Sequence, residues 1–177
     1  MKYFTPERYL RLQDRSNEQG FLMALEDWER AVAEYREHLE QMRAKAPNGL
    51  RQLSDLVCLH DAAVLDMWWG GRTRFTITLH PESEPSRLVI LTYSLLASPE
   101  VSKVLPEAVR PRPVGWLYDE LNVINQSGES GFSHDILLSD GREVFLQCRG
   151  VTVLRPIPLI PSTPESHLSA NPIRHSA

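Results

Sequence analysis

The stretch Phe132-Ser133-His134-Asp135-Ile136-Leu137-Leu138-Ser139-Asp140-Gly141-Arg142-Glu143-Val144-Phe145-Leu146 places an Asp-Gly pair between two apolar runs. Asp-Gly in this setting is a strong local signal for a β-hairpin with a type I′ turn, in which both central residues have positive φ. The sequence therefore predicts strands over 132–138 and 142–154, joined by a type I′ turn at Asp140-Gly141.

The same two-residue period extends back through the chain from about residue 55. It predicts further strands over 56–59, 63–69, 72–80, 87–96 and 115–124, with a second hairpin at Gly70-Gly71. Phe75, Ile77 and Leu79 alternate with polar residues, which is typical of a sheet with one dry face. No segment between these strands is long enough for a crossover helix, so the sheet is expected to be an antiparallel meander or a partly closed barrel.

Helical signals occupy the chain before residue 54. Thr5 can cap a first helix that has Pro6 at its first position. A second, long helix is predicted over 21–46 from an apolar heptad seam: Leu25, Trp28, Val32, Tyr35, Leu39, Met42 and Ala46. This seam can cover the protein's own sheet or join two copies as a homodimer. The predicted fold class is α+β, with N-terminal helices packed on the antiparallel sheet.

The chain of 177 residues has the length of one domain. We expect that domain over 1–155, with a helical part at 1–53 and a sheet part at 54–155. Residues 98–113 are expected to form a long irregular connection with one helical turn at 102–108. Residues 156–177 hold five of the 13 prolines and show no hydrophobic period, which predicts a disordered tail.

Charge and composition exclude several classes of partner. The 19 basic and 23 acidic residues give a net charge of −4, which argues against binding of nucleic acid or an anionic membrane. No apolar run reaches membrane-spanning length, and the opening residues lack the features of a secretory signal. Cys58 and Cys148 are expected to be buried, reduced thiols, so we expect a cytoplasmic protein. The excess of acid lies in the sheet part, which favours a basic protein partner.

Two His-Asp dipeptides are the strongest candidates for catalytic chemistry. His60-Asp61 and His134-Asp135, with Glu120, carry the residue types of acid-base or metal sites. Adjacent strand residues point to opposite faces, however, so a His and the Asp beside it do not readily chelate one ion. His134 shares its predicted face with apolar residues, which favours a buried, hydrogen-bonded histidine. The chain has no nucleotide-binding, zinc-binding or nucleophile motif, so we expect no metal and no cofactor.

Aromatic residues on the predicted strands are candidates for binding. Neighbouring Trp68 and Trp69 must face opposite sides of one strand, so one of them lies on the wetter face or at an edge. Trp69, Trp116 and Tyr118 are therefore candidate contacts for a protein partner. The alternative for each is packing in the core or beneath a helix.

Three short motifs together resemble an uncharacterised family of bacterial proteins. They are Met1-Lys2-Tyr3-Phe4-Thr5, Leu59-His60-Asp61-Ala62, and Phe132-x-His134-x-Ile136-Leu137-x-Ser139-Asp140-Gly141. The resemblance implies a bacterial cytosolic protein of helices and antiparallel sheet, and it supplies no reaction or catalytic residue. The strand entry and the hairpin are also similar to those of immunity-type proteins, which bind a partner.

Two functions follow as hypotheses. The first is a non-enzymatic protein-binding or accessory domain, because catalytic signatures are lacking and the strands carry surplus aromatic residues. The alternative is a small hydrolase or metal-dependent enzyme that uses His60, Asp61, His134 or Glu120. Convergence of those four side chains in one pocket would favour the enzyme.

Overall fold

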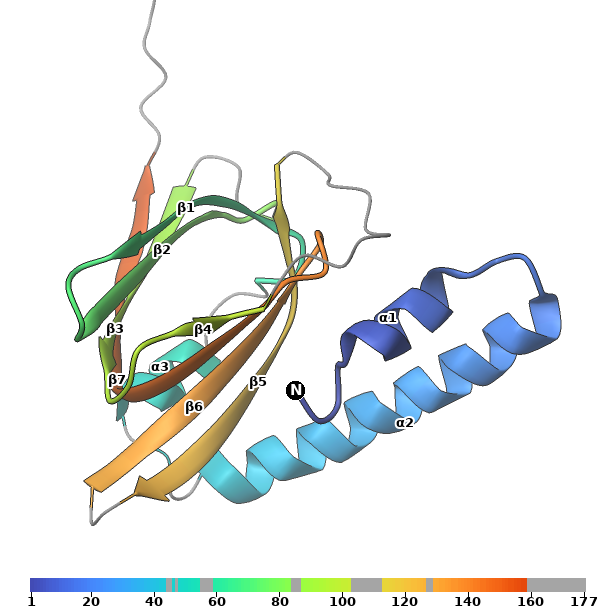
Figure 1. Ribbon diagram of the computed structural model, residues 1–177, viewed down its shortest axis with the longest axis horizontal. Helices are drawn as coiled ribbons and strands as arrows, with labels where there is room; N and C mark the ends of the chain where they lie inside the picture. Colours follow the sequence, from blue (N-terminus) through green and yellow to red (C-terminus); the bar gives the residue numbers. More distant parts are fainter. Residues whose placement is uncertain are drawn as a thin grey trace, which may run out of the picture.

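The computed structural model describes residues 1–43, 46, 48–54, 59–83, 87–102, 113–126 and 129–158. Within these residues, three helices precede seven strands (Figure 1). The helices are α1 (Pro6–Gln13), α2 (Glu18–Arg43) and α3 (Asn48–Ser54). The strands are β1 (Ala62–Trp69), β2 (Arg74–His80), β3 (Arg87–Leu95), β4 (Glu100–Val101), β5 (Gly115–Gln126), β6 (Glu129–Leu138) and β7 (Glu143–Pro158). The predicted α+β class, with helices first and an antiparallel sheet second, is confirmed.

The sheet is ring-like. Its strand order is β3-β2-β1-β5-β6-β7-β4, and β3 also pairs with β7, so six strands follow one another around a ring. Every pairing is antiparallel. The contact between β1 and β5 is short, with Ala62 opposite Trp116 and Ala63 opposite Gly115. Beyond these pairs, β1 and β2 arch away from β5 (Figure 1).

Two apolar clusters lie on the two sides of β5. The inner cluster fills the ring with side chains such as Phe75, Leu91, Trp116 and Phe132, and α3 contributes to it. The outer cluster packs the N-terminal segment and α2 against β5, through Tyr3, Phe4, Trp28, Ala31 and Tyr35. The apolar seam of α2 therefore covers this chain's own sheet. The structure holds no second copy, so the homodimer stays a prediction.

The N-terminal helices largely follow their sequence signals. Thr5 caps α1 by accepting a hydrogen bond from the Arg8 N–H, with Pro6 at the first turn. The long helix runs over Glu18–Arg43, three residues earlier at each end than the predicted 21–46. Helix α3 was not predicted. It lies so close to β7 that a Cβ at Gly49 would be 2.7 Å from the Val151 carbonyl oxygen, which explains the glycine.

The Asp-Gly hairpin joins β6 to β7 as predicted, but the turn type was wrong. Only Gly141 has positive φ, at 79°, whereas a type I′ turn needs a second positive φ at Asp140. Gly141 N–H donates to Leu138 O, and Leu138 N–H donates to Arg142 O. These bonds define a three-residue loop with a type I turn followed by a glycine bulge. Asp140 stays out of the left-handed region because its carboxylate accepts from the Arg142 N–H and Nε.

Bulges in β1 and β5 change which side chains share a face. The pairing register shifts between Val64 and Asp66, and again between Trp116 and Tyr118. Each shift inserts one residue, and one extra residue moves the following side chains to the other face. Trp116 therefore points into the ring, whereas Tyr118 faces α2.

Several predictions lie outside the described residues. They are Cys58, most of the strand over 56–59, most of the helical turn over 102–108, and the tail beyond Pro158; Leu59 itself is described and is not in a strand. The last strand extends to Pro158, three residues past the predicted domain end. Within the described part of the chain, no helix combines the length and apolar character that a membrane crossing requires.

Candidate functional site

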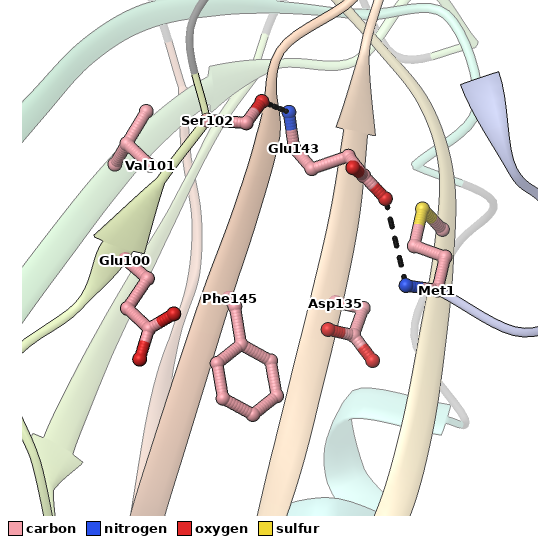
Figure 2. A pocket seen from close by; sticks show the side chains of 7 residues that line it. All are labelled: Met1, Glu100, Val101, Ser102, Asp135, Glu143 and Phe145. Carbon is pink, nitrogen blue, oxygen red and sulfur yellow. Dashed lines mark hydrogen bonds and ion pairs between the residues drawn. The ribbon is translucent and has the colours of Figure 1, made fainter.

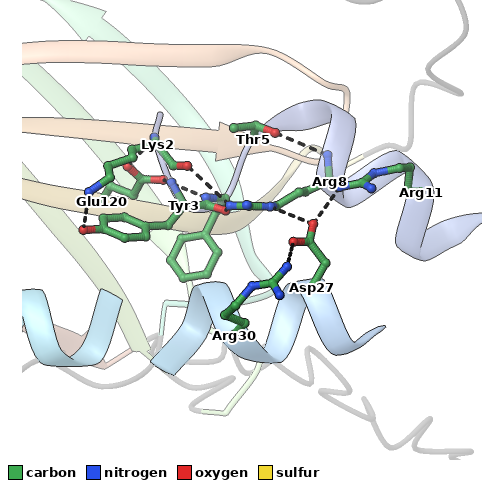
Figure 3. Close-up of polar contacts among 9 residues, drawn as sticks. Lys2, Tyr3, Thr5, Arg8, Arg11, Asp27, Arg30 and Glu120 are labelled. Carbon is green, nitrogen blue, oxygen red and sulfur yellow. Dashed lines mark hydrogen bonds and ion pairs between the residues drawn. The ribbon is translucent and has the colours of Figure 1, made fainter. Parts of the chain in front are cut away.

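Glu120 is completely buried, and it anchors the N-terminal segment. Its Oε1 accepts hydrogen bonds from the backbone N–H groups of Tyr3 and Phe4, at 2.6 and 2.7 Å, and its Oε2 accepts from Lys2 N–H at 2.7 Å. Figure 3 shows this carboxylate beside Lys2 and Tyr3. The three donors meet the hydrogen-bonding needs of a buried carboxylate, so Glu120 holds the N-terminal segment against the sheet.

A second carboxylate links the two N-terminal helices. Asp27 of α2 binds Arg8 and Arg11 of α1 at 3.0 and 2.7 Å, and Arg30 of its own helix at 2.6 Å (Figure 3). Hydrogen bonds from Arg30 and Arg8 lower the pKa of Asp27 to about 2. Arg8 also donates to the carbonyl of Tyr3. Asp27 and Glu120 thus fix the N-terminal segment from both ends.

His134 is buried inside the ring, on the opposite face of the sheet from Glu120. Its Nε2 lies 3.1 Å from Asp119 Oδ2, and its Nδ1 lies 3.0 Å from the Tyr93 hydroxyl. An ionised carboxylate only accepts hydrogen bonds, so Nε2 carries the proton and Tyr93 donates to Nδ1. Burial first, and then the neighbouring Cys148 and Asp119, raises the pKa of Tyr93 well above its usual value, which keeps its hydroxyl proton in place.

Asp119 is the accessible end of this chain of hydrogen bonds. Its side chain is 31% exposed, and its other oxygen accepts from Trp116 Nε1 at 3.1 Å. In a catalytic triad the histidine faces the substrate and the carboxylate is buried behind it. Here the order is reversed, because the histidine is at 0% exposure. The arrangement satisfies the polar groups of Tyr93, His134 and Trp116 within an apolar interior.

His60 and Asp61 form the turn that leads into β1. His60 Nδ1 lies 3.4 Å from Asp61 Oδ1, and the His60 ring packs on Tyr118. Asp61 adopts a positive φ of 64°, which Asp tolerates better than most residues, and donates its N–H to Trp116 O. Both side chains are exposed.

The four candidate catalytic residues therefore do not converge. Glu120 pairs with Asp135, whereas Leu121 pairs with His134, so Glu120 and His134 point to opposite faces. His60 and Asp61 lie at the surface. Among the described residues, no group of three or more His, Cys, Asp or Glu side chains is arranged to hold a metal ion.

Acidic side chains gather in a hollow that sequence reasoning missed. Figure 2 shows Glu100, Asp135 and Glu143 with Phe145 around this hollow. The hollow has a volume of about 460 Å³ and is lined also by Met1, Val101 and Ser102. The Met1 amino group lies 3.5 Å from Glu143 Oε1. Burial raises the pKa of Asp135, the Met1 ammonium lowers it, and Glu120 raises it further. The alternation of β6 and β7 could have placed Asp135 beside Phe145, but not Glu100 or the amino terminus.

The aromatic candidates separate into core and surface. Trp116 is fully buried, so it is a core residue and offers no surface to a partner. Tyr118 lies in the outer cluster, with its ring 4.5 Å from that of Trp28 and 5.2 Å from that of Phe4. Trp69 remains 46% exposed, and Trp68, which sequence reasoning placed on the opposite side of the strand, is 56% exposed.

The exposed tryptophans lie on a strand edge that we call the β1 edge, defined as residues 66–69 on the side away from β2. The Val64 N–H donates to Val114 O at 2.8 Å, and no described residue pairs with this side of β1 beyond that bond. Leu65, the bulge residue, is 53% exposed beside it. Within the described part of the chain, the β1 edge thus combines unpaired backbone groups with large exposed apolar side chains.

Comparison of the chain with protein-family models finds no match, and comparison with curated proteins finds no relative.

Proposed function

We propose that this protein is a non-enzymatic protein-binding module that receives an extended segment of a partner along the β1 edge. The observation that carries the proposal is the edge at residues 66–69, which pairs with no described residue and carries the exposed side chains of Leu65, Trp68 and Trp69. A free strand edge presents a row of N–H and C=O groups, which is complementary to another extended chain.

The described ladder between β1 and β5 is short. It runs back from Trp116 to Val114, whose carbonyl oxygen accepts from the Val64 N–H. Beyond Val64, β1 continues without a second neighbour among the described residues.

The hydrogen-bond alternation shows which groups are available. Gly70 N–H donates to Arg74 O, so Gly70 faces β2. Backbone groups in an antiparallel strand alternate sides, so Trp68 also faces β2, whereas Met67 and Trp69 turn their N–H and C=O outward. Two residues with both groups free can form four hydrogen bonds with an added strand.

The free edge of β5 shows the contrast, because side chains of α2 cover it. Leu121 N–H donates to the Tyr35 hydroxyl at 2.8 Å, and Leu121 O lies 3.3 Å from His38 Nε2. Covering an edge with a helix is a usual protection against unwanted strand pairing. No described side chain does the same for Met67 or Trp69.

Other features support the same function. Exposed tryptophan is enriched among the residues that contribute most to interfaces. The alternative of a small hydrolase or metal-dependent enzyme has no comparable support, because its candidate residues lie apart. We also infer a cytoplasmic location, supported by the buried, unpaired thiol of Cys148.

The test is selection of binding peptides from a displayed random library, followed by mapping on the ¹⁵N-labelled protein. We expect selected peptides to shift the amides of residues 65–69, and Trp68→Ala to weaken binding at least tenfold. Met23→Ala, which removes an equally exposed apolar side chain from α2, is the control and should have no effect. Shifts confined to another surface would refute the proposal. A concentration-dependent dimer that Trp68→Ala abolishes would instead show that a second copy occupies the edge.

A further inference from the structure

We infer that the segment bound at the β1 edge is an antiparallel strand with an apolar side chain beside Trp68 and, two residues later, a Lys or Arg beside Asp66. The inference rests on the proposed function and specifies the partner's sequence. It follows from the faces, the direction and the charges of β1.

The direction of the added strand follows from β5. Strand β5 runs antiparallel to β1, and the last hydrogen bond between these two strands joins the Val64 N–H to the Val114 carbonyl oxygen. Met67 and Trp69 each turn N–H and C=O outward, and these groups can bind an added strand that keeps the antiparallel direction of β5. Antiparallel pairing is also slightly more stable per residue than parallel pairing.

The faces fix which partner side chains meet which residues. Asp66 pairs with Thr78 and Trp68 with Thr76, so both lie on the outer face of the sheet. Met67 and Trp69 pair with Ile77 and Phe75, which point into the ring. A partner residue opposite Trp68 therefore precedes by two positions the residue opposite Asp66, because the chains run in opposite directions.

The ring of Trp68, which the partner's apolar side chain would contact, is held in place by its neighbours. A Cβ at Gly70 would lie 2.8 Å from the Trp68 ring and 3.2 Å from the Arg74 Cβ, so the ring lies over the end of the hairpin. Its outer-face neighbours across the sheet, Thr76 and Thr92, are in contact through their hydroxyls at 3.4 Å. The exposed ring offers a fixed apolar surface to one partner side chain.

The charges then order the partner's residues. Asp66 is exposed, no described residue forms an ion pair with it, and its row across the sheet continues with the uncharged Thr78 and Ile90. Arg74 lies on the same face beyond Trp68, at the hairpin end, and is also exposed. A basic residue after the apolar one lies opposite Asp66, whereas a basic residue before it lies opposite Gly70, in the row that continues with Arg74 on β2. Directly opposed unlike charges stabilise strand pairs and like charges destabilise them.

Two capped peptides of the same composition test the order. In Thr-Val-Tyr-Val-Lys-Thr the Lys follows the Tyr by two positions, and in Thr-Lys-Val-Tyr-Val-Thr it precedes it. Dissociation constants come from amide titrations of the ¹⁵N-labelled protein. We expect the first peptide to bind about two- to fivefold more tightly, and Asp66→Asn to remove that preference. Glu29→Gln, an equivalent charge loss on α2, should leave it unchanged.

The outcomes separate this inference from the proposed function. If both peptides shift residues 66–69 and lose affinity in Trp68→Ala, but the second binds as tightly as the first, the inference is wrong and the β1 edge remains the binding site. If neither peptide shifts these amides at millimolar concentration, the inference and the proposed function are both overturned. Asp66→Lys gives a positive check, because it should tighten the binding of the first peptide when Glu replaces its Lys.

Discussion

Replacing Glu120 by Gln should release the N-terminal segment from the sheet. The substitution keeps the size of the side chain but removes its charge and one of its two acceptor atoms. If the amide oxygen stays with the N–H groups of Tyr3 and Phe4, the amide nitrogen faces the N–H of Lys2, and two donors meet. No rotation of the amide can satisfy all three donors.

The magnitude follows from the three bonds. A hydrogen bond to a charged group contributes about 1.5–3 kcal/mol, and a neutral acceptor forms bonds of roughly half that strength. Losing one bond and weakening two amounts to about 3–6 kcal/mol, and relief of the buried charge offsets about 1 kcal/mol of this. We therefore expect Glu120→Gln to lower the free energy of unfolding by about 2–5 kcal/mol. The loss of stability cannot exceed the cost of detaching residues 1–4 from the sheet. That detachment exposes the buried side chains of Tyr3 and Phe4, which costs about 1.5–3 kcal/mol for each side chain.

Two measurements check this expectation. Urea unfolding gives the change in stability, and amide hydrogen exchange reports whether Tyr3 and Phe4 lose protection before the sheet does. Glu143→Gln is the control, since this carboxylate lies on the same face but is 33% exposed, and its loss should cost less than about 1 kcal/mol. A Glu120→Gln protein within about 0.5 kcal/mol of wild type, with unchanged protection of both amides, would refute the anchoring role.

Three further predictions concern buried groups. Tyr93→Phe leaves His134 Nδ1 without its donor in the core, so urea unfolding should show a loss of about 1–3 kcal/mol; no change would mean that the bond does not form. Burial raises the pKa of Asp135 above 3.8, so the stability of the wild-type protein should fall as pH rises through that raised pKa. Unfolding measured across this pH range should show that Asp135→Asn removes the fall. Parallel pH profiles of the two proteins would contradict this. Burial also raises the pKa of Cys148 to about 12, so in a Cys58→Ser protein a thiol reagent at pH 8 should react only after denaturant is added; rapid native reaction would show an accessible thiolate.

The sequence located the strands well because their signals are local. Alternation of apolar residues and the Asp-Gly pair act over two to ten positions, and the structure places a strand at every predicted strand that it describes in full. The predicted turn type was wrong because a type I turn followed by a glycine bulge needs only one residue with positive φ. Gly141 supplies that residue, so no second positive φ is required. Asp140 binds Arg142 instead of entering the left-handed region.

Bulges change the faces that simple alternation would give. Simple alternation puts Trp116 and Tyr118 on one face, and the inserted residue in β5 puts them on two. A bulge depends on the register with the partner strand, and a single sequence carries no information on that register. Trp116 and Tyr118, both candidate contacts for a partner, therefore lie on different faces, Trp116 in the inner cluster and Tyr118 in the outer cluster.

The role of Glu120 could not be read from the sequence for a different reason. Its partners are backbone N–H groups 116 to 118 positions away, and nearly every residue has such a group. A carboxylate on a strand therefore looks the same whether it binds a substrate or the chain itself. The burial of His134 was predicted correctly, because apolar residues occupy the alternate positions beside it. Burial in turn requires hydrogen-bond partners for both ring nitrogens.

The β1 edge differs in kind from these buried groups, because the same chain shows how such an edge can be closed. Pairing of β3 with β7 removes two edges, and Tyr35 and His38 cover the exposed groups of Leu121. An uncovered edge exposes the protein to unwanted pairing, and the bulge at Leu65 and the charge of Asp66 both limit that risk without covering Met67 or Trp69. Such partial protection is what a selective binding edge needs, because a fully covered edge binds nothing and a bare apolar edge binds any strand.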